Sequence, residues 1–252
     1  MPRASLQLLC ALLAALIAGC DDRPAASAAP SKAPVAVVSA TSTITGRIFL
    51  RGKIPVLAPI DVSGVAECAR LHPDGILDEA IVAGSDGALQ NVIVYLRGVA
   101  PDSGGASRPP AVLDQIGCRY QPHVIALESG QMLRVQSSDP FLHNVHIKSV
   151  ANESGNFSQL AESGQPAVTD VRFSVPEIFP IQCDVHPWMR AWVGVFDHPY
   201  FAVTDNAGAF RIERVPPGSF TIVAWHERFG EIAAPLSIAD AKNATIDLSY
   251  SR

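Results

Sequence analysis

The most informative segment of the chain reads Cys183-Asp184-Val185-His186-Pro187-Trp188-Met189, and a short apolar stretch at residues 192–196 follows it. A thiolate, an imidazole and a thioether therefore lie in one short loop that leads into an expected strand. Soft sulfur ligands combined with imidazole select copper among the common metal ions. A trigonal site of one Cys and two His with a weak axial Met needs one more histidine than this loop contains.

The missing imidazole is available upstream, in Leu142-His143-Asn144-Val145-His146. We expect His143 to complete the ligand set. His146 lies three residues further on, where a regular strand turns the side chain to the opposite face, so we expect a core or surface histidine there. The alternative for the whole constellation is a set of unrelated core and turn residues.

Residues 183–190 closely resemble the ligand loop of the amicyanins, which are blue-copper proteins of the cupredoxin family related to plastocyanin. His143-Asn144-Val145-His146 resembles the upstream ligand motif of the same family. The resemblance covers roughly residues 121–196 and implies a Greek-key cupredoxin sandwich. It also implies one mononuclear copper ion, with the ligands His143, Cys183, His186 and Met189. Asn144 would tie the two ligand loops together by hydrogen bonds.

The same resemblance implies single-electron transfer without enzymatic turnover, because the protein fills every coordination position. The expected partner is a redox protein such as a c-type cytochrome or a quinoprotein dehydrogenase. Pro187 and Trp188 are candidates for an apolar docking patch, since large aromatic side chains anchor interfaces. The alternative for Trp188 is that it packs beneath the loop.

The composition favours an all-β chain. The 18 Gly and 20 Pro interrupt almost every segment, which argues for short strands joined by turns. A hairpin is expected to join residues 79–83 and 91–96 through Ser85-Asp86-Gly87. Further strands are expected at residues 44–50, 124–127, 131–136, 145–150, 171–175, 192–196, 201–204, 210–214, 219–225 and 244–248. Many short strands predict a sandwich or a barrel.

The C-terminal segment has a second resemblance. Residues 201–210 and 215–222, with Ala224-Trp225-His226, resemble the carboxypeptidase regulatory-like domain and the noncatalytic prealbumin-like sandwich of rhamnogalacturonan lyases. The opening strands of such modules are matched far upstream, by residues 44–48 and 91–96. We therefore expect residues 42–100 to complete the sandwich of residues 199–252, with a copper domain at 101–198 inserted between them. The alternative is that residues 44–98 open the cupredoxin sandwich.

The amino terminus predicts export. Arg3 and the apolar run at residues 6–17 are typical of a signal peptide, and Leu16-Ile17-Ala18-Gly19-Cys20 resembles the lipobox of bacterial lipoproteins. Residues 1–19 would then be removed and Cys20 acylated; the alternative is an ordinary secretory signal. Residues 20–41, largely Ala, Pro and Ser, predict a flexible tether. The expected location is the periplasmic face of the inner or the outer membrane.

The chain has five cysteines, and three of them have other expected uses. Cys10 leaves with the signal, Cys20 carries the lipid and Cys183 is a candidate metal ligand, so Cys68 and Cys118 remain as a disulfide pair. Two buried free thiols are the alternative. A net charge of −5 without a basic run argues against nucleic-acid binding.

Two other classes of function stay open beside the electron carrier. One is a periplasmic protein that binds, senses or delivers copper. The other is a surface module, for polysaccharide among other ligands, in which metal is incidental. Only 7% of residues are aromatic, which disfavours carbohydrate platforms. Lyase activity is the weakest interpretation, because the resembling domain of those enzymes is not the catalytic one.

Overall fold

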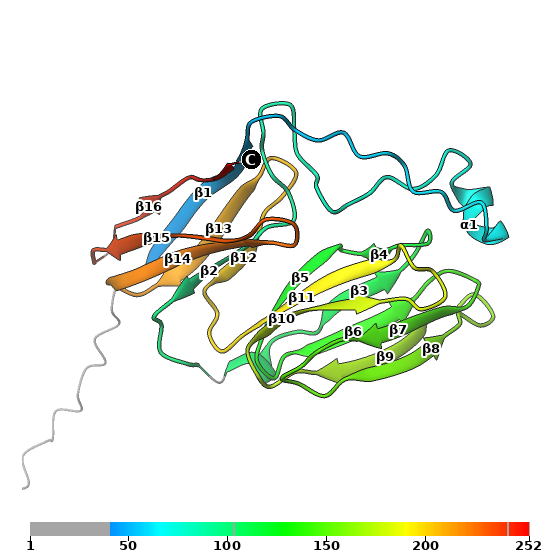
Figure 1. Ribbon diagram of the computed structural model, residues 1–252. Coiled ribbons are helices and arrows are strands. Elements are labelled where there is room, and N and C mark those ends of the chain that lie inside the picture. Colours follow the sequence, from blue (N-terminus) through cyan, green and yellow to red (C-terminus); the bar gives the residue numbers. More distant parts are fainter. Residues whose placement is uncertain (1–40, 103, 241, 252) are drawn as a thin grey trace, which may run out of the picture. The chain divides into compact units, whose positions relative to one another are not determined.

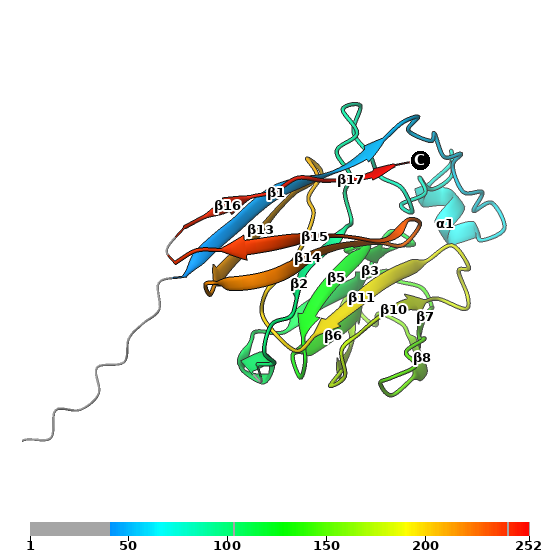
Figure 2. The same ribbon diagram turned by 60° about the vertical axis from the view of Figure 1, so that its left-hand side comes forward.

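The first and last strands of the described chain pair with each other. The computed structural model describes residues 41–102, 104–240 and 242–251 (Figure 1). β1 (Ser42–Arg51) runs antiparallel to β13 (Ala209–Val215) and parallel to β16 (Ala244–Thr245) and β17 (Leu248–Ser251). Figure 2 shows β1 flanked by these C-terminal strands. Alternate residues of β1 are buried, which is the period expected of a strand with one face in a core.

A second sheet packs on this one. It contains, in spatial order, β12 (Phe201–Val203), β2 (Ile93–Arg97), β14 (Gly218–His226) and β15 (Gly230–Ile238). Ile44 and Ile48 of β1 share a buried cluster with Leu96 of β2 and with Ile222 and Ala224 of β14. Residues from the beginning and the end of the described chain therefore form one sandwich.

The intervening residues form another sandwich. Its five-stranded sheet has the order β5 (Val124–Glu128), β11 (Arg190–Phe196), β10 (Glu177–Gln182), β7 (His143–Ile147) and β8 (Gly155–Gln159). The facing four-stranded sheet has the order β4 (Tyr120–Gln121), β3 (Ala111–Gln115), β6 (Met132–Ser137) and β9 (Ala167–Arg172). The core between them is a cluster of buried apolar side chains that includes Leu133, Val145, Phe179 and Val193.

The protein is thus an all-β sandwich fold, as the composition predicts. β1 pairs with C-terminal strands and with none of the described strands between residues 121 and 196. The alternative in which residues 44–98 open the cupredoxin sandwich does not match these pairings. All described residues belong to one compact unit, Ser39–Arg252. The expected signal peptide and Cys20, with residues 20–40 of the expected tether, lie outside the described residues.

Residues 52–92 depart from the expectation. They form no named strand; they contain the short helix α1 (Ala66–Leu71), and the expected hairpin shrinks to the single bridge Ala83↔Leu89. The Ser85-Asp86-Gly87 turn does form, because Asp86 accepts the N–H of Ala88 at 3.0 Å. The part of the segment that holds α1 packs beside the candidate metal loops rather than in the C-terminal sandwich.

Several strands were not predicted from the sequence. β10 and β15 contain Pro180 and Pro235, and proline argues against a strand because it lacks an N–H. β15 is the edge of its sheet, and β10 pairs with β7 only at Ile181 and Gln182, beyond the proline. The ladders tolerate both residues for these reasons.

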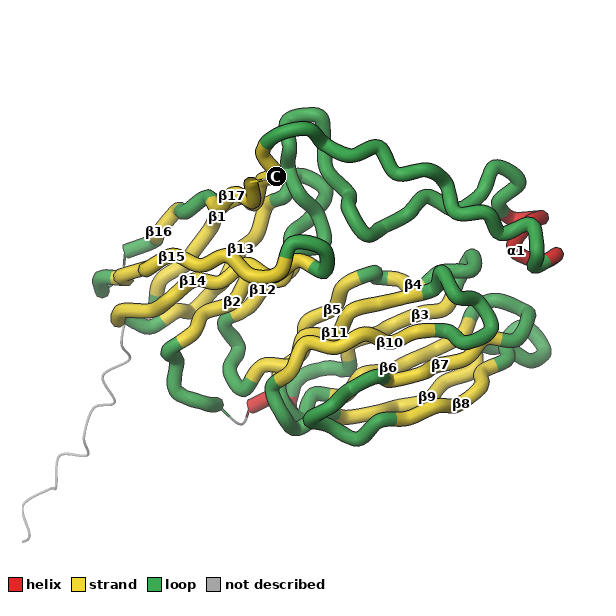
Figure 3. The backbone as a smooth tube through the Cα atoms, viewed as in Figure 1, coloured by secondary structure: helices red, strands yellow, loops and turns green. Residues whose placement is uncertain are grey.

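Figure 3 shows how little of the described chain is helical, and no helix there is long and apolar enough to cross a membrane.

The two sandwiches contact each other through a further buried cluster. Ile93 from the C-terminal sandwich packs with Val124 and Phe196 from the inserted one. At the same interface the Trp192 indole N–H donates to Glu227 at 3.0 Å, and Glu227 also pairs with His123. Apolar and charged contacts therefore both join the sandwiches.

Replacing Gly46 tests the packing of β1 against the C-terminal strands. A Cβ at Gly46 would lie 1.8 Å from the backbone oxygen of Ile246, so Gly46→Ala must push two backbones apart. We expect the free energy of unfolding, measured by chemical denaturation, to fall by ~3 kcal/mol. Gly64→Ala is the control, because nothing lies within 4 Å of its added Cβ. Equal stability of the two variants would contradict the observed packing.

Candidate metal centre

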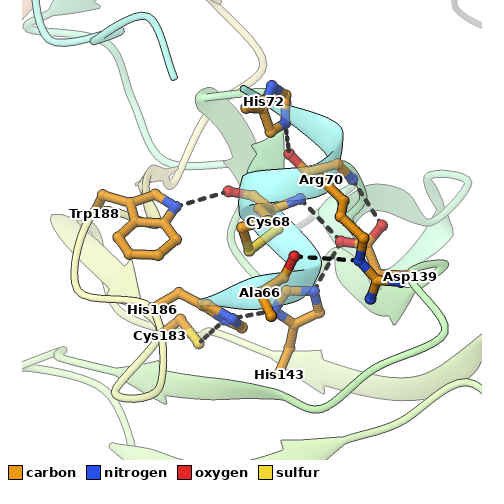
Figure 4. The surroundings of a disulfide bond; sticks show 11 residues. Ala66, Cys68, Arg70, His72, Asp139, His143, Cys183, His186 and Trp188 are labelled. Atoms are coloured by element: carbon orange, nitrogen blue, oxygen red, sulfur yellow. Dashed lines mark hydrogen bonds and ion pairs between the residues drawn. A yellow bond between two sulfur atoms is a disulfide. The ribbon is translucent and has the colours of Figure 1, made fainter. Parts of the chain in front are cut away.

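Three buried side chains from two distant segments converge inside the inserted sandwich. His143 begins β7, whereas Cys183 and His186 lie in the loop between β10 and β11. One donor atom of each lies within 4.8 Å of the other two. His143 Nδ1 is 3.0 Å from His186 Nδ1, which is 3.5 Å from Cys183 Sγ (Figure 4). Their exposed fractions are 0%, 1% and 2% for His143, His186 and Cys183, so the donor atoms face one another away from bulk water.

Two backbone hydrogen bonds shape the loop. The β10–β11 ladder ends at the pair Gln182↔Arg190, and residues 183–189 bulge from it. Cys183 N–H donates to the Met189 carbonyl at 3.1 Å, and Met189 N–H donates to the His186 carbonyl at 2.9 Å. Cys183 and Met189 therefore lie opposite each other at the base of the loop. Met189 is buried and belongs to the same apolar cluster as Cys183.

Strand pairing brings the upstream histidine to this loop. β7 runs antiparallel to β10, with Gln182 opposite His146. His143 is consequently placed beside the residues that follow Gln182. His146 does not join the cluster: its side chain is partly exposed and its Nδ1 lies 2.9 Å from a carboxylate oxygen of Asp184.

Asn144 connects the two ligand segments. Its backbone N–H donates to Cys183 Sγ at 3.3 Å, and its side-chain oxygen accepts the N–H of Asp184 at 3.1 Å. Its amide nitrogen donates to Asn156 on β8 at 2.6 Å. Asn144 thus holds the cysteine loop against β7 and β8, which is the bridging arrangement that the sequence resemblance implies.

Asp139 is a buried neighbour of the cluster that the sequence patterns missed. This buried carboxylate accepts a hydrogen bond from His143 Nε2 at 2.8 Å. It also accepts the backbone N–H groups of Gly117 at 2.8 Å and Cys118 at 2.9 Å. The only available signal was a carboxylate four residues before a candidate ligand histidine, within a Ser138-Asp139-Pro140 stretch that looks like an ordinary turn. Because Asp139 engages Nε2, it leaves His143 Nδ1 directed at the cluster.

The site favours a thiolate. Burial opposes ionisation of Cys183, but hydrogen bonds from His143, His186 and the N–H of Asn144 outweigh it and lower the pKa of the thiol to about 6. Burial likewise opposes charging of His143, yet its bonds to Asp139 and Cys183 raise its pKa overall. Burial raises the pKa of Asp139, whereas its hydrogen bonds to His143 and to two backbone N–H groups lower it further, so the net shift is downward.

Cys68 and Cys118 form a disulfide with Cα atoms 5.9 Å apart, so the two cysteines left over by the cysteine count are joined. The indole N–H of Trp188 donates to the Cys118 carbonyl at 3.1 Å, and its ring centroid lies 5.4 Å from that of His186. Trp188 is therefore packed between the ligand loop and the disulfide, while Pro187 is exposed. A docking role for this pair stays a prediction.

The donor set fits copper. A thiolate and two imidazoles face one another, a thioether lies at the base of the same loop, and no carboxylate oxygen enters the three-residue group. Oxygen-preferring ions such as Mg²⁺ and Ca²⁺ are therefore poorly matched, whereas soft sulfur with imidazole suits copper.

No family model matches the chain, and no curated protein matches it. Among solved structures, a reduced amicyanin variant is 17% identical with a TM-score of 0.30, covering 41% of this chain and 98% of its own. A purple cupredoxin from Nitrosopumilus maritimus is 18% identical with a TM-score of 0.29, covering 34% of this chain and 99% of its own. A Cu-containing nitrite reductase from Thermus scotoductus is 18% identical with a TM-score of 0.32 over 48% of this chain; the chain spans only 27% of that enzyme. The chemistry of the site follows from its own side chains.

The low pKa of the Cys183 thiol makes the unfolding free energy of the metal-free protein depend on pH. Its folded value of about 6 lies below the usual 9.0, so between these pH values the unfolded chain binds more protons than the folded one. The stability gained from the ionised thiol is therefore complete above pH 9 and is lost as the pH falls toward 6. Urea unfolding of the wild type and Cys183→Ser across this range measures it. We expect the difference in unfolding free energy to grow with pH, and a constant difference would contradict the thiolate.

Proposed function

We propose that the protein binds one mononuclear copper ion through His143, Cys183, His186 and Met189 and transfers single electrons. The observation that carries this proposal is the convergence of two imidazole nitrogens and a sulfur within 4.8 Å of one another in a buried cluster. Copper, when bound, would supply the exchange between its cupric and cuprous states. A trigonal Cys-His-His arrangement with a weak axial Met suits this use.

The chain's own residues hold this geometry. Asp139 fixes the ring of His143 through Nε2, and the N–H of Asn144 donates to the cysteine sulfur. Both ligand segments are anchored in one hydrogen-bonded sheet through β7, β10 and β11. A site held in this way changes little between oxidation states, which keeps the reorganisation that accompanies electron transfer small.

The burial of the site separates this function from its alternatives. With four protein ligands, the proposed metal would have no vacant position for a substrate, which favours a carrier over an enzyme. Handing copper to another protein needs a ligand that can be displaced, whereas His143, Cys183 and His186 are almost fully enclosed. Storage or delivery is therefore a weaker candidate than electron transfer.

The proposal extends to location and partner. The lipobox-like segment ending at Cys20 supports an exported protein held by a lipid at the periplasmic face of the inner or the outer membrane. The partner would be a redox protein such as a c-type cytochrome or a quinoprotein dehydrogenase. Mass spectrometry of the mature amino terminus tests the anchor, because an unmodified terminus other than Cys20 would refute it.

Copper loading tests the site. The protein loaded with one equivalent of Cu(II) should show an intense thiolate-to-copper charge-transfer band and a narrow copper hyperfine splitting. Cys183→Ser should abolish the band. Met189→Leu should keep copper bound and raise the reduction potential, because it removes a weak donor.

Two neighbouring histidines provide a matched pair of variants. His143→Ala should lose the charge-transfer band, while His146→Ala should retain it, because only His143 faces the cluster. Absence of the band in the fully loaded wild type would refute the blue-copper assignment. Equal loss in the two variants would refute the ligand choice.

A further inference from the structure

The disulfide joins a distant helix to a turn beside the ligands. Cys68 lies in α1, and Cys118 lies in the turn between β3 and β4. His72, just after α1, shares a hydrogen bond between its Nε2 and the Gly117 carbonyl at 2.8 Å. Figure 4 shows α1 alongside His143, Cys183 and His186. α1 and the residue after it are thus attached to two consecutive residues of the turn, Gly117 and Cys118.

The backbone of this turn is unusual. Gly117 has φ +62° and Cys118 has φ +56°, so two successive residues adopt the left-handed conformation, which costs energy for a residue with a side chain. Successive N–H groups in such turns form a concave site for anions. Here both groups point at one carboxylate, that of Asp139.

The turn also reaches the second ligand segment. The Cys118 carbonyl accepts the indole N–H of Trp188, whose ring lies beside His186. Through Asp139 the turn acts on His143, and through Trp188 it acts on His186. One strained turn is therefore in contact with the immediate neighbours of both histidines.

We infer that the Cys68–Cys118 disulfide is a positioning device for the metal site. It holds the Gly117–Cys118 turn in the left-handed conformation, the turn orients Asp139, and Asp139 selects the tautomer of His143 that presents Nδ1. Cys118 and Asp139 are positioning residues, since neither provides a donor atom to the cluster. The tautomer part of this inference needs no metal, while its effect on copper rests on the proposed function.

A purely structural disulfide would behave differently. It would stabilise the fold by closing a long loop, and its removal would lower the unfolding midpoint without changing the imidazole of His143. A positioning disulfide changes the imidazole even where the protein is fully folded. The tautomer of His143 separates the two roles.

The first experiment uses the metal-free protein. Nitrogen-15 NMR of the histidine rings reports which nitrogen carries the proton. The spectra are recorded above the pKa of His143, which its bonds to Asp139 and Cys183 raise, and in the wild type we then expect the ring protonated at Nε2 only. Cys68→Val/Cys118→Ala keeps the apolar volume and should give a mixture of tautomers. An unchanged tautomer in this folded variant would overturn the inference.

Asp139→Asn keeps the disulfide and tests whether Asp139 sets the tautomer of His143. Asparagine has one acceptor oxygen and cannot receive both backbone N–H groups and His143 as the carboxylate does, so the tautomer should again become mixed. Asp170→Asn is the control, because Asp170 is a carboxylate on β9 paired with Arg134 outside the cluster. If Asp139→Asn behaves like the control, the inference is wrong, even where the disulfide variant fails to fold.

Combining the changes tests the order of the links. If the disulfide acts through Asp139, the variant lacking both should show no larger change than Asp139→Asn alone. Copper measurements then extend the result. Competition with a chelator should show about 10- to 100-fold weaker Cu(II) binding in either variant, and the reduction potential should rise because His143 becomes a poorer donor. A normal tautomer response in a protein that binds no copper would refute the proposed function and leave the positioning role intact.

Discussion

The pairing of the first and last described strands is the constraint on which the rest of the structure depends. β1 lies between β13 and the strands β16 and β17, so the C-terminal sandwich cannot close until β17 is available to pair. In its second sheet β2 pairs with β12, with Tyr95 opposite Phe201. The chain between them therefore leaves and returns at one place. An inserted domain with neighbouring ends satisfies this condition.

The inserted sandwich holds both candidate ligand segments in a single sheet. The ligand loop emerges from a continuous β10–β11 ladder, and β7 is locked to β10 on the other side. Since both ligand segments belong to one sheet, the cluster is held by main-chain hydrogen bonds and not by flexible side chains alone. The thiolate, the imidazoles and the buried carboxylate then stabilise one another, which offsets the cost of burying charge.

The segment between β1 and β2 contributes to both sandwiches: Leu89 and Val92 near its end lie in the core of the C-terminal sandwich, and its earlier part packs beside the inserted one. Val62, Cys68 and Ile76 of this segment form a small apolar cluster with Cys118, against which Phe141 and Trp188 pack. Phe141 also lies 5.1 Å, ring to ring, from His143. Residues from outside the inserted sandwich thus contribute to the surroundings of its candidate ligands, and the disulfide is one of the contacts that hold this segment there.

The local patterns of the sequence determined much of this protein. Alternating apolar residues at 44–50, the turn at Asp86-Gly87 and the Cys183–Met189 loop follow from chemistry within a few residues, so the all-β class and the candidate ligands could be predicted. The tertiary structure alone decided the rest. Pro180 and Pro235 lie in strands that only their sheet positions permit, and the part of residues 52–92 that holds α1 has no local pattern that directs it to the candidate ligands. Asp139 looks like a turn residue until the fold places His143 on one side of it and two N–H groups on the other. The physical reason is that periodicity and turn chemistry act over a few residues, whereas a hydrogen bond between distant segments depends on where the completed sheets bring them.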